Sequence, residues 1–333
     1  MTLATALPLF KTVQAHGSHN TFVKPGELID VIELTPLTLQ DRRIYNMLLA
    51  NAWHDIEQDK IHVIAKKELR HQSDTVNFRV SKSLDRLMGA FVKVQLERNG
   101  KSIIQRISLL GTNEEEHRQD GLFRYQFPAE LRDIIKQSTV FARLQKTIMY
   151  SFKCKYALAL YEIVQKRGQL KYKTYEDFEI ETFRGLLGVA PGKLKGFGNF
   201  KAWAINPAVK EVNFLSDYQV SAEPLKAGKT VTKIRLTWQA KSKEGMQNLL
   251  SELSYSSTGR KARMRGQAEV IARRQIGTKT FEQAKALVLE AGTGWDIYAI
   301  EQQFFDYIDQ NEAPSDINKA FIGFVRKKIT KQA

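Results

Sequence analysis

In the N-terminal half of the chain, apolar residues recur at helical spacing in some segments and alternate in others. Thr38 and Asp41 have the spacing of a capping box, which predicts that a helix begins there. Residues 75–91 place apolar side chains on one helical face and a basic stripe on the opposite face. Asn99 and Gly100 separate two apolar runs, a pattern typical of a β-hairpin. The expected elements are a strand at 29–34, a helix from 38, a strand at 61–64, helices at 66–70 and 75–91, hairpin strands at 92–96 and 103–109, and a strand at 122–127 that joins the hairpin sheet.

Three helices followed by a hairpin are the order of elements in a winged helix. In this variant of the helix-turn-helix, the third helix enters a major groove and the hairpin contacts the neighbouring DNA backbone. A similar order follows later in the chain, without obvious sequence repetition. Its expected elements are a long helix at 141–167, a helix at 175–187, a loop rich in Gly and Lys at 188–198, a helix at 199–215, and hairpin strands at 218–222 and 230–238.

The helix at 199–215 has an apolar face and a polar face. Its polar face includes Trp203, which either packs under the hairpin or meets the ligand, and packing is the favoured interpretation. Pro207 either kinks this helix or occupies its first turn behind an Asn206 cap, and both alternatives stand. The positions expected to be buried are Phe200, Ala204, Ala208 and Val212.

The chain is therefore expected to be an α+β protein with two tandem winged-helix domains and a mainly helical C-terminal extension. Short helices are expected at 281–290, 296–310 and 316–328, the last with Ser315 as its cap. The predicted domains are an N-terminal arm at 1–34, a first winged-helix domain at 35–150, a second at 151–240, a flexible basic linker at 241–279 and the helical extension at 280–333.

Charge indicates the class of ligand. The 333 residues contain 51 Lys and Arg against 36 Asp and Glu, a formal net charge of +15. The basic residues concentrate in three separate segments, 60–110, 186–240 and 260–274, which favours a binding face over a single basic tail. A soluble chain with this balance is expected to bind a polyanion, most simply nucleic acid.

Several classes of protein are disfavoured. A single cysteine excludes a disulfide framework and a multi-cysteine zinc site. No run of 18 apolar residues predicts a membrane span, and no basic segment precedes an apolar stretch at the N-terminus, so a cytoplasmic location is expected. Residues 227–230 resemble the end of a phosphate-binding P-loop, but Glu223 occupies the position of its first glycine. The six histidines lack metal-site spacing, and Cys154 lies in an apolar helical stretch as a core residue. We therefore expect no enzymatic activity, no cofactor and no metal.

Four motifs in the second half of the chain resemble those of a known family. They are Lys155-Tyr-Ala-Leu-Ala-Leu-Tyr161-Glu162, with Cys154 where serine is usual; Phe183-Arg-Gly-Leu-Leu-Gly188-Val189; Phe200-Lys201 followed by Asn206-Pro-Ala-Val-Lys-Glu-Val-Asn213; and residues 226–234. In this order they resemble the iteron-binding replication initiator (Rep) proteins of plasmids. The resemblance covers about residues 34–238, and segments around 294–298 and 320–324 resemble a C-terminal extension found in some members. Ala202 and Trp203 depart from the family, whose members often carry a basic pair there.

The resemblance implies a function for each domain. The second winged helix would make the main base contacts in double-stranded direct repeats, and the first would contact DNA or mediate dimerisation. Monomers would bind the repeats at a plasmid origin, promote its opening and recruit the host initiator and replicative helicase. Dimers would repress the protein's own promoter at an inverted-repeat operator and so contribute to copy control. The alternative is a winged-helix transcriptional regulator without a replication role.

The candidate DNA contacts lie on the two third helices, the glycine-rich loop and the hairpins. Asn pairs with adenine and Arg with guanine when a helix lies in the major groove, whereas hairpin lysines contact phosphates. Asparagine on a solvated helix often contacts no base, so both interpretations of the three asparagines, base contact and plain solvent exposure, stand. The candidates are Arg79, Lys82, Arg86, Lys101, Lys193, Lys195, Asn199, Lys201, Asn206, Lys210, Asn213, Lys226, Lys229 and Lys233.

Overall fold

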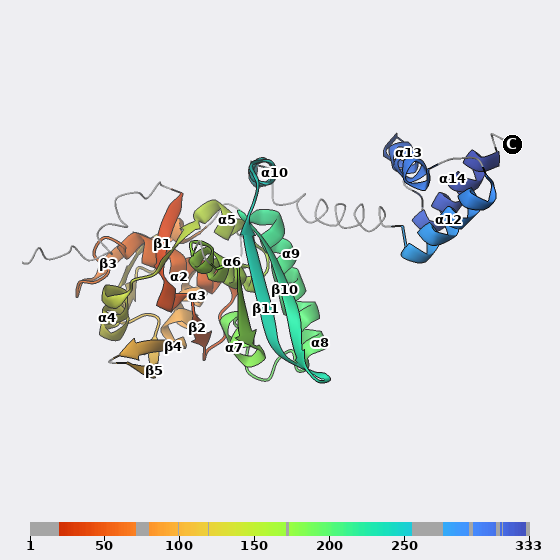
Figure 1. Ribbon diagram of the computed structural model, residues 1–333. Coiled ribbons are helices and arrows are strands. Elements are labelled where there is room, and N and C mark those ends of the chain that lie inside the picture. The colour runs from red at the N-terminus through yellow and green to blue at the C-terminus, as the bar shows by residue number, and fades with distance from the viewer. Residues whose placement is uncertain are drawn as a thin grey trace, which may run out of the picture. The chain divides into compact units, whose positions relative to one another are not determined.

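The structure is a computed structural model whose chain divides into two compact units, Met1–Tyr255 and Ser256–Ala333. It describes residues 20–70, 80–98, 100–118, 120–170, 173–254, 276–292, 296–310, 314 and 316–330. Figure 1 shows helices combined with small antiparallel sheets in the first unit and helices in the second. The α+β class and the helical C-terminal region are confirmed.

The first domain has a helical core with a hairpin beside it. The hydroxyl of Thr38 accepts from the N–H of Asp41, and the Thr38 N–H donates to the Asp41 carboxylate, which confirms the capping box. The hairpin is also confirmed, and Gly100 adopts the positive φ of 69° that its turn requires. The elements are β2 (Val31–Glu33), α2 (Leu39–Ala52), β3 (His62–Ala65), η3 (Lys66–Leu69), α3 (Val80–Met88), β4 (Phe91–Arg98), β5 (Lys101–Ser108), β6 (Asn113–Glu115), β7 (Leu122–Tyr125) and α4 (Ala129–Gln137).

Strand β7 does not join the hairpin sheet, so that prediction is wrong. β7 lies between β3 and β6 in one three-stranded sheet, whereas the hairpin pairs with β2 in another, in the order β2-β4-β5. Tyr125 on β7 is fully buried, and its hydroxyl donates to the carbonyl of Leu48 at 2.7 Å. The central place of β7 satisfies its backbone on both sides. The exposed edge of the hairpin sheet is β5.

The segment that joins the two domains is only partly helical. A helix was expected over 141–167, but β8 (Phe141–Gln145) pairs antiparallel with β1 (Thr21–Pro25), and α5 (Lys146–Ser151) and α6 (Lys155–Gly168) follow. β1 and the 3₁₀ helix η2 (Gly26–Leu28) are also largely buried, so this part of the expected arm belongs to the folded unit. A pairing between segments more than a hundred residues apart leaves no local signal in the pattern of β8.

The second domain repeats the winged-helix order. A helix was expected over 175–187, but its first half is a strand, β9, which pairs with the second hairpin strand. Figure 1 shows the long hairpin lying along the third helix. The elements are β9 (Tyr175–Glu179), α7 (Ile180–Leu186), α8 (Phe197–Phe200), η4 (Lys201–Ile205), α9 (Asn206–Leu215), β10 (Tyr218–Ala227) and β11 (Thr230–Ala240).

Pro207 does not begin a new helix behind an Asn206 cap. Ile205 and Asn206 both have helical backbone angles, so α8, η4 and α9 form one continuous helix. The η4 turn is a π-helix, in which the Asn206 N–H donates to the carbonyl of Lys201 five residues earlier. This wider turn accommodates the proline ring, which lacks an N–H and would clash with the preceding turn of an α-helix.

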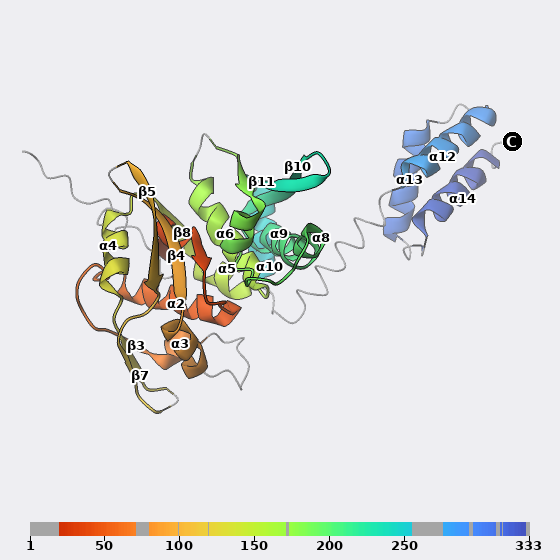
Figure 2. The ribbon, with the colours of Figure 1, turned by 90° about the horizontal axis from the view of Figure 1, so that it is seen from below.

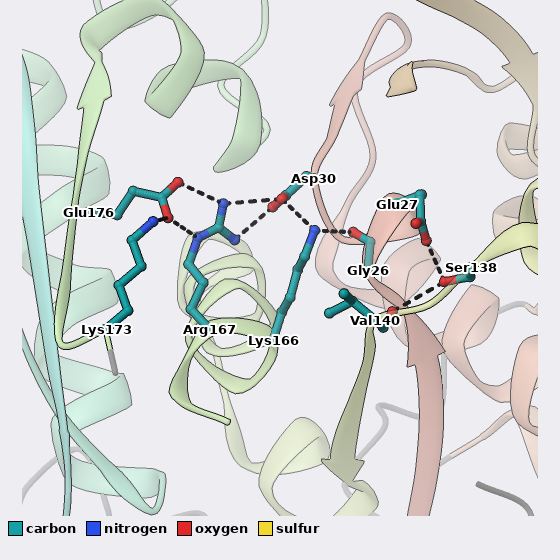
Figure 3. Close-up of polar contacts among 9 residues, drawn as sticks. All are labelled: Gly26, Glu27, Asp30, Ser138, Val140, Lys166, Arg167, Lys173 and Glu176. Atoms are coloured by element: carbon teal, nitrogen blue, oxygen red, sulfur yellow. Dashed lines mark hydrogen bonds and ion pairs between the residues drawn. The ribbon is translucent and has the colours of Figure 1, made fainter. Parts of the chain in front are cut away.

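Ion pairs that are buried or partly buried join the two domains of the first unit. Figure 3 shows the Asp30 carboxylate between Lys166 and Arg167 of α6, at 2.7 and 2.8 Å, with Arg167 also reaching Glu176 of β9 at 3.2 Å. Burial alone would raise the pKa of Asp30, but the charges and hydrogen bonds of Arg167 and Lys166 outweigh burial and lower it. Nearby, Lys24 of β1 pairs with Glu162 of α6 at 2.9 Å. The domains are therefore held in part by ion pairs that are partly shielded from solvent.

Residues after the second hairpin form a helix and then a separate bundle. α10 (Lys243–Ser254) occupies the first part of the expected linker, and its Leu249 is buried in the core of the second domain. Residues 255–275 lie outside the described part of the chain. The three expected C-terminal helices are confirmed, and Figure 2 shows them side by side. Their core includes Phe304 and Phe321. They are α12 (Thr278–Glu290), α13 (Ile297–Gln310) and α14 (Ile317–Thr330). The predicted cap Ser315 lies outside the described residues.

Candidate nucleic-acid interface

The continuous helix α8–η4–α9 separates its side chains onto two faces. All four positions expected to be buried are buried, with Phe200, Ala204, Ala208 and Val212 each at 0% exposure. Trp203 is 68% exposed, so the interpretation that it packs under the hairpin is wrong. The solvent face of the helix carries the exposed residues Asn199, Lys201, Ala202, Trp203, Asn206 and Lys210.

Two of the three candidate asparagines have protein partners. The amide of Asn213 donates to the Val220 carbonyl at 2.9 Å and accepts from the Val220 N–H at 2.6 Å, which binds α9 to the first hairpin strand. The amide nitrogen of Asn199 donates to the carbonyl of Lys195 at 3.1 Å. Asn206 is exposed on the same helix. Of the three, Asn206 is therefore the one whose amide the described part of the chain leaves to solvent.

The loop before this helix and the tip of the hairpin bring lysines to one hollow. Lys193, Lys195 and Lys229 are exposed and line a surface hollow of about 810 Å³, bounded by α7, the loop, the hairpin tip and β2. Lys226 is exposed on the same hairpin. The three lysines that line the hollow come from two segments of the sequence, the loop and the hairpin tip, which the fold brings together.

Lys233 lies further from the hairpin tip and is paired. Its Nζ lies 3.0 Å from Glu179 of β9. Its neighbour Arg235 forms a two-pronged ion pair with Asp177, with both distances 2.7 Å. Alternation along β11 is as expected, since Ile234 is buried between them. The outer face of β11 thus neutralises part of its own positive charge with β9.

The first domain brings together fewer of its candidates. Arg79 lies outside the described residues, and Lys82 is exposed on α3. Arg86 forms a two-pronged ion pair with the buried carboxylate of Asp41, at 2.8 and 2.7 Å. Burial alone would raise the pKa of Asp41, but the hydrogen bonds from Arg86 and Thr38 hold it below its usual value. Lys101 is exposed at the hairpin turn, so among the described candidates of this domain Lys82 and Lys101 are exposed without an ion pair, whereas Arg86 is paired although its side chain is 41% exposed.

Two residues with structural roles in the interface were missed from the sequence. Glu211 on α9 accepts from the backbone N–H groups of Lys153 and Cys154, at 3.0 and 3.1 Å, and so holds the start of α6. Burial raises the pKa of Glu211 despite these hydrogen bonds. Arg184 on α7 donates to two loop carbonyls. Both residues lie within the family motifs, and this was the only sign in the sequence that they matter. Their structural roles could not be predicted from the pattern of neighbouring residues.

Other chemistry has little support in the described residues. Burial raises the pKa of the Cys154 thiol, and the side chain packs against the core of the second domain, in keeping with a core residue. Within the described ranges, no three His, Cys, Asp or Glu side chains are grouped as a metal site would require. None of the helices there has the length and apolar character needed to cross a membrane.

Two helix-loop-helix units, each followed by a hairpin and carrying exposed basic residues, define a DNA-binding protein of the tandem winged-helix class. A family model described as "Initiator Replication protein, WH1" matches residues 21–165, and one described as "Initiator Rep protein, WH2" matches residues 179–238. Together these ranges cover more than half of the chain. The chain belongs to the iteron-binding plasmid replication initiator (Rep) family, which is a family of DNA-binding initiators rather than of classical enzymes.

Two solved structures have a low similarity to part of this chain. The crystal structure of the Pi initiator protein in complex with iteron DNA has 16% sequence identity and a TM-score of 0.47, and the match covers 68% of this chain and 100% of that chain. Domains 2 and 3 of RctB have 11% identity and a TM-score of 0.38, covering 68% of this chain and 89% of that one. No curated protein sequence matches the chain.

Proposed function

We propose that this initiator binds double-stranded direct repeats at a plasmid origin mainly through its second winged helix. The observation that carries the proposal is the separation of buried and exposed side chains on the continuous helix at 197–215. Its inner face is fully buried, while Asn206 and Lys210 are exposed on the outer face. With that face in a major groove, Asn206 would pair with adenine and Lys210 with guanine. The exposed Trp203 would offer apolar surface to a thymine methyl group.

The lysines around the helix would position the protein on the backbone. Lys193, Lys195, Lys226 and Lys229 are exposed on the loop and the hairpin, and three of them line one hollow. Phosphate contacts of this kind fix register and orientation without specifying sequence. In the first domain, Lys82 and Lys101 would add a second, weaker backbone contact. A monomer with two such domains matches a direct repeat, which has no two-fold symmetry.

Dimerisation would use the first domain and oppose repeat binding. Strand β5 is the edge of its sheet, and Ile104 on it is 62% exposed. An exposed edge strand with an apolar side chain is suited to pairing with the same strand of a second copy. We propose that the dimer represses the protein's own promoter, while the monomer opens the origin and recruits the host initiator and replicative helicase. The family membership supports this division of roles.

Footprinting on the DNA that flanks the protein's own gene tests the proposal. Protection of tandem direct repeats is the expected result, whereas protection of a lone palindrome would favour a transcriptional regulator without a replication role. Titrations with the protected site and with a random duplex then separate base contacts from backbone contacts. Lys210→Ala should weaken specific binding by about 1–3 kcal/mol more than random binding, and Lys229→Ala should weaken both equally. Equal losses for both variants would refute the assignment of the reading helix.

A further inference from the structure

The loop before the reading helix has an unusual backbone that one arginine holds in place. Leu194 has a φ of +51°, and it is the one residue other than glycine with a positive φ in the described part of the chain. This left-handed conformation costs about 1–2 kcal/mol for a residue with a side chain. Leu194 itself is partly buried against the core of the second domain. Its neighbours Lys193 and Lys195 are both exposed.

Arg184 of α7 compensates for this strained turn. Its Nη2 donates to the carbonyls of Lys193 at 2.6 Å and of Leu194 at 2.9 Å. Its guanidinium also lies over the ring of Phe200, 4.7 Å from the ring centroid. Phe200 is a fully buried residue of the reading helix. Through these contacts, one side chain connects α7, the lysine-bearing loop and the reading helix.

Three lysines line the adjoining hollow of about 810 Å³, and their positive charge indicates that its ligand is an anion. Lys193 and Lys195 come from the loop, and Lys229 comes from the hairpin tip. Two carboxylates also line the hollow: Glu33 is paired with Arg42 at 2.7 Å, and Glu181 lies 3.7 Å from Arg184. An anion-binding hollow beside a helix that reads bases fits the phosphates of the DNA strand next to the groove.

We propose that Arg184 is a positioning residue that preforms this hollow as a seat for DNA backbone phosphates. The proposal rests on the proposed function and adds to it a reason why the loop lysines are in place before DNA arrives. Arg184 acts through the loop, since its own side chain is only 14% exposed. A lysine at this position would keep the charge, but it lacks the planar guanidinium that stacks on the Phe200 ring while its Nη2 donates to two carbonyls.

The test measures how the wild-type full chain and three variants bind two duplexes. One is a random-sequence duplex of about 30 base pairs, and the other is the DNA that flanks the protein's own gene. The variants are Arg184→Lys, the pair Lys193→Ala with Lys195→Ala, and the combination of all three substitutions. Arg184→Lys and the lysine pair should each weaken binding to both duplexes by about tenfold, and the lysine pair should reduce the log–log salt slope by about 2. The combined variant should bind no more weakly than the lysine pair, because Arg184 acts through those lysines.

A matched control and a measurement without DNA complete the test. Arg132→Lys alters an arginine of similar exposure, 12%, which donates to a carbonyl in the first domain, and it should leave binding unchanged. Hydrogen exchange of the free protein should be faster over residues 189–197 in Arg184→Lys and unchanged elsewhere, which shows that the variant remains folded.

Three outcomes would overturn the proposal. In the first, the lysine pair loses affinity but Arg184→Lys does not. In the second, the combined variant loses about tenfold more than the lysine pair. In the third, loop exchange is unchanged in Arg184→Lys. Failure of the wild-type protein to prefer its flanking DNA would instead refute the proposed function itself, so the two failures are distinguishable.

Discussion

Replacing Asn213 or Asn206 by alanine should affect different properties of the protein, although both are asparagines of the same helix. The Asn213 amide forms two hydrogen bonds with the backbone of Val220, one as donor and one as acceptor, whereas the Asn206 side chain is exposed to solvent. We therefore expect Asn213→Ala to reduce stability, and Asn206→Ala to reduce specific DNA binding while leaving stability unchanged.

The magnitude for Asn213 follows from its two hydrogen bonds. Each hydrogen bond contributes about 0.5–1.5 kcal/mol, and a buried backbone group left without its partner costs about 1–3 kcal/mol. Val220 is only 4% exposed, so water does not readily replace the lost amide. We expect a loss of about 2–3 kcal/mol in the free energy of unfolding. For Asn206→Ala the expected change in that free energy is within about 0.5 kcal/mol, as for other exposed positions.

Urea denaturation of the full chain, followed by tryptophan fluorescence, measures the first quantity, because Trp238 lies in the core of the second domain. Titration with specific and random duplexes measures the second. Asn206→Ala should lose about 1–3 kcal/mol on the specific site alone. If Asn213→Ala kept its full stability, or if Asn206→Ala lost as much stability as Asn213→Ala, the division between a structural and a reading asparagine would be refuted.

Three further predictions concern dimerisation, acid stability and salt. Ile104→Lys, on the edge strand β5, should increase the monomer fraction in sedimentation without lowering the melting temperature, and an unchanged mass would contradict the proposed interface. Asp30→Asn should lower the free energy of unfolding at pH 7 by about 2–3 kcal/mol. Because the pKa of Asp30 is lowered in the folded state, the stabilisation is present above its ordinary value of 3.8 and is lost as the pH falls through the folded pKa, so wild type and variant should converge in urea titrations at acid pH. The log–log salt dependence of wild-type binding should have a slope near −7, and Lys229→Ala should reduce its magnitude by about 1, with an unchanged slope arguing against a phosphate contact.

Local pattern was sufficient to predict several elements of the fold. The Thr38 capping box, the Gly100 turn and the apolar face of the helix at 199–215 all depend on residues a few positions apart, so the sequence contains their whole cause. The three C-terminal helices belong to the same class. The basic segments and the family motifs likewise indicate DNA binding, because charge and motif order are properties of the sequence itself.

Only the tertiary structure decided which segments pair and which charged side chains remain available. β8 pairs with β1, β9 with β11 and β7 with β3, and none of these long-range partners leaves a trace in local periodicity. All four basic candidates Lys82, Arg86, Lys229 and Lys233 are exposed, but Arg86 and Lys233 pair with acidic side chains that are distant in the sequence, whereas Lys82 and Lys229 form no ion pair in the described part of the chain. A side chain's availability depends on what the folded chain places beside it, and spacing along the sequence does not contain that information.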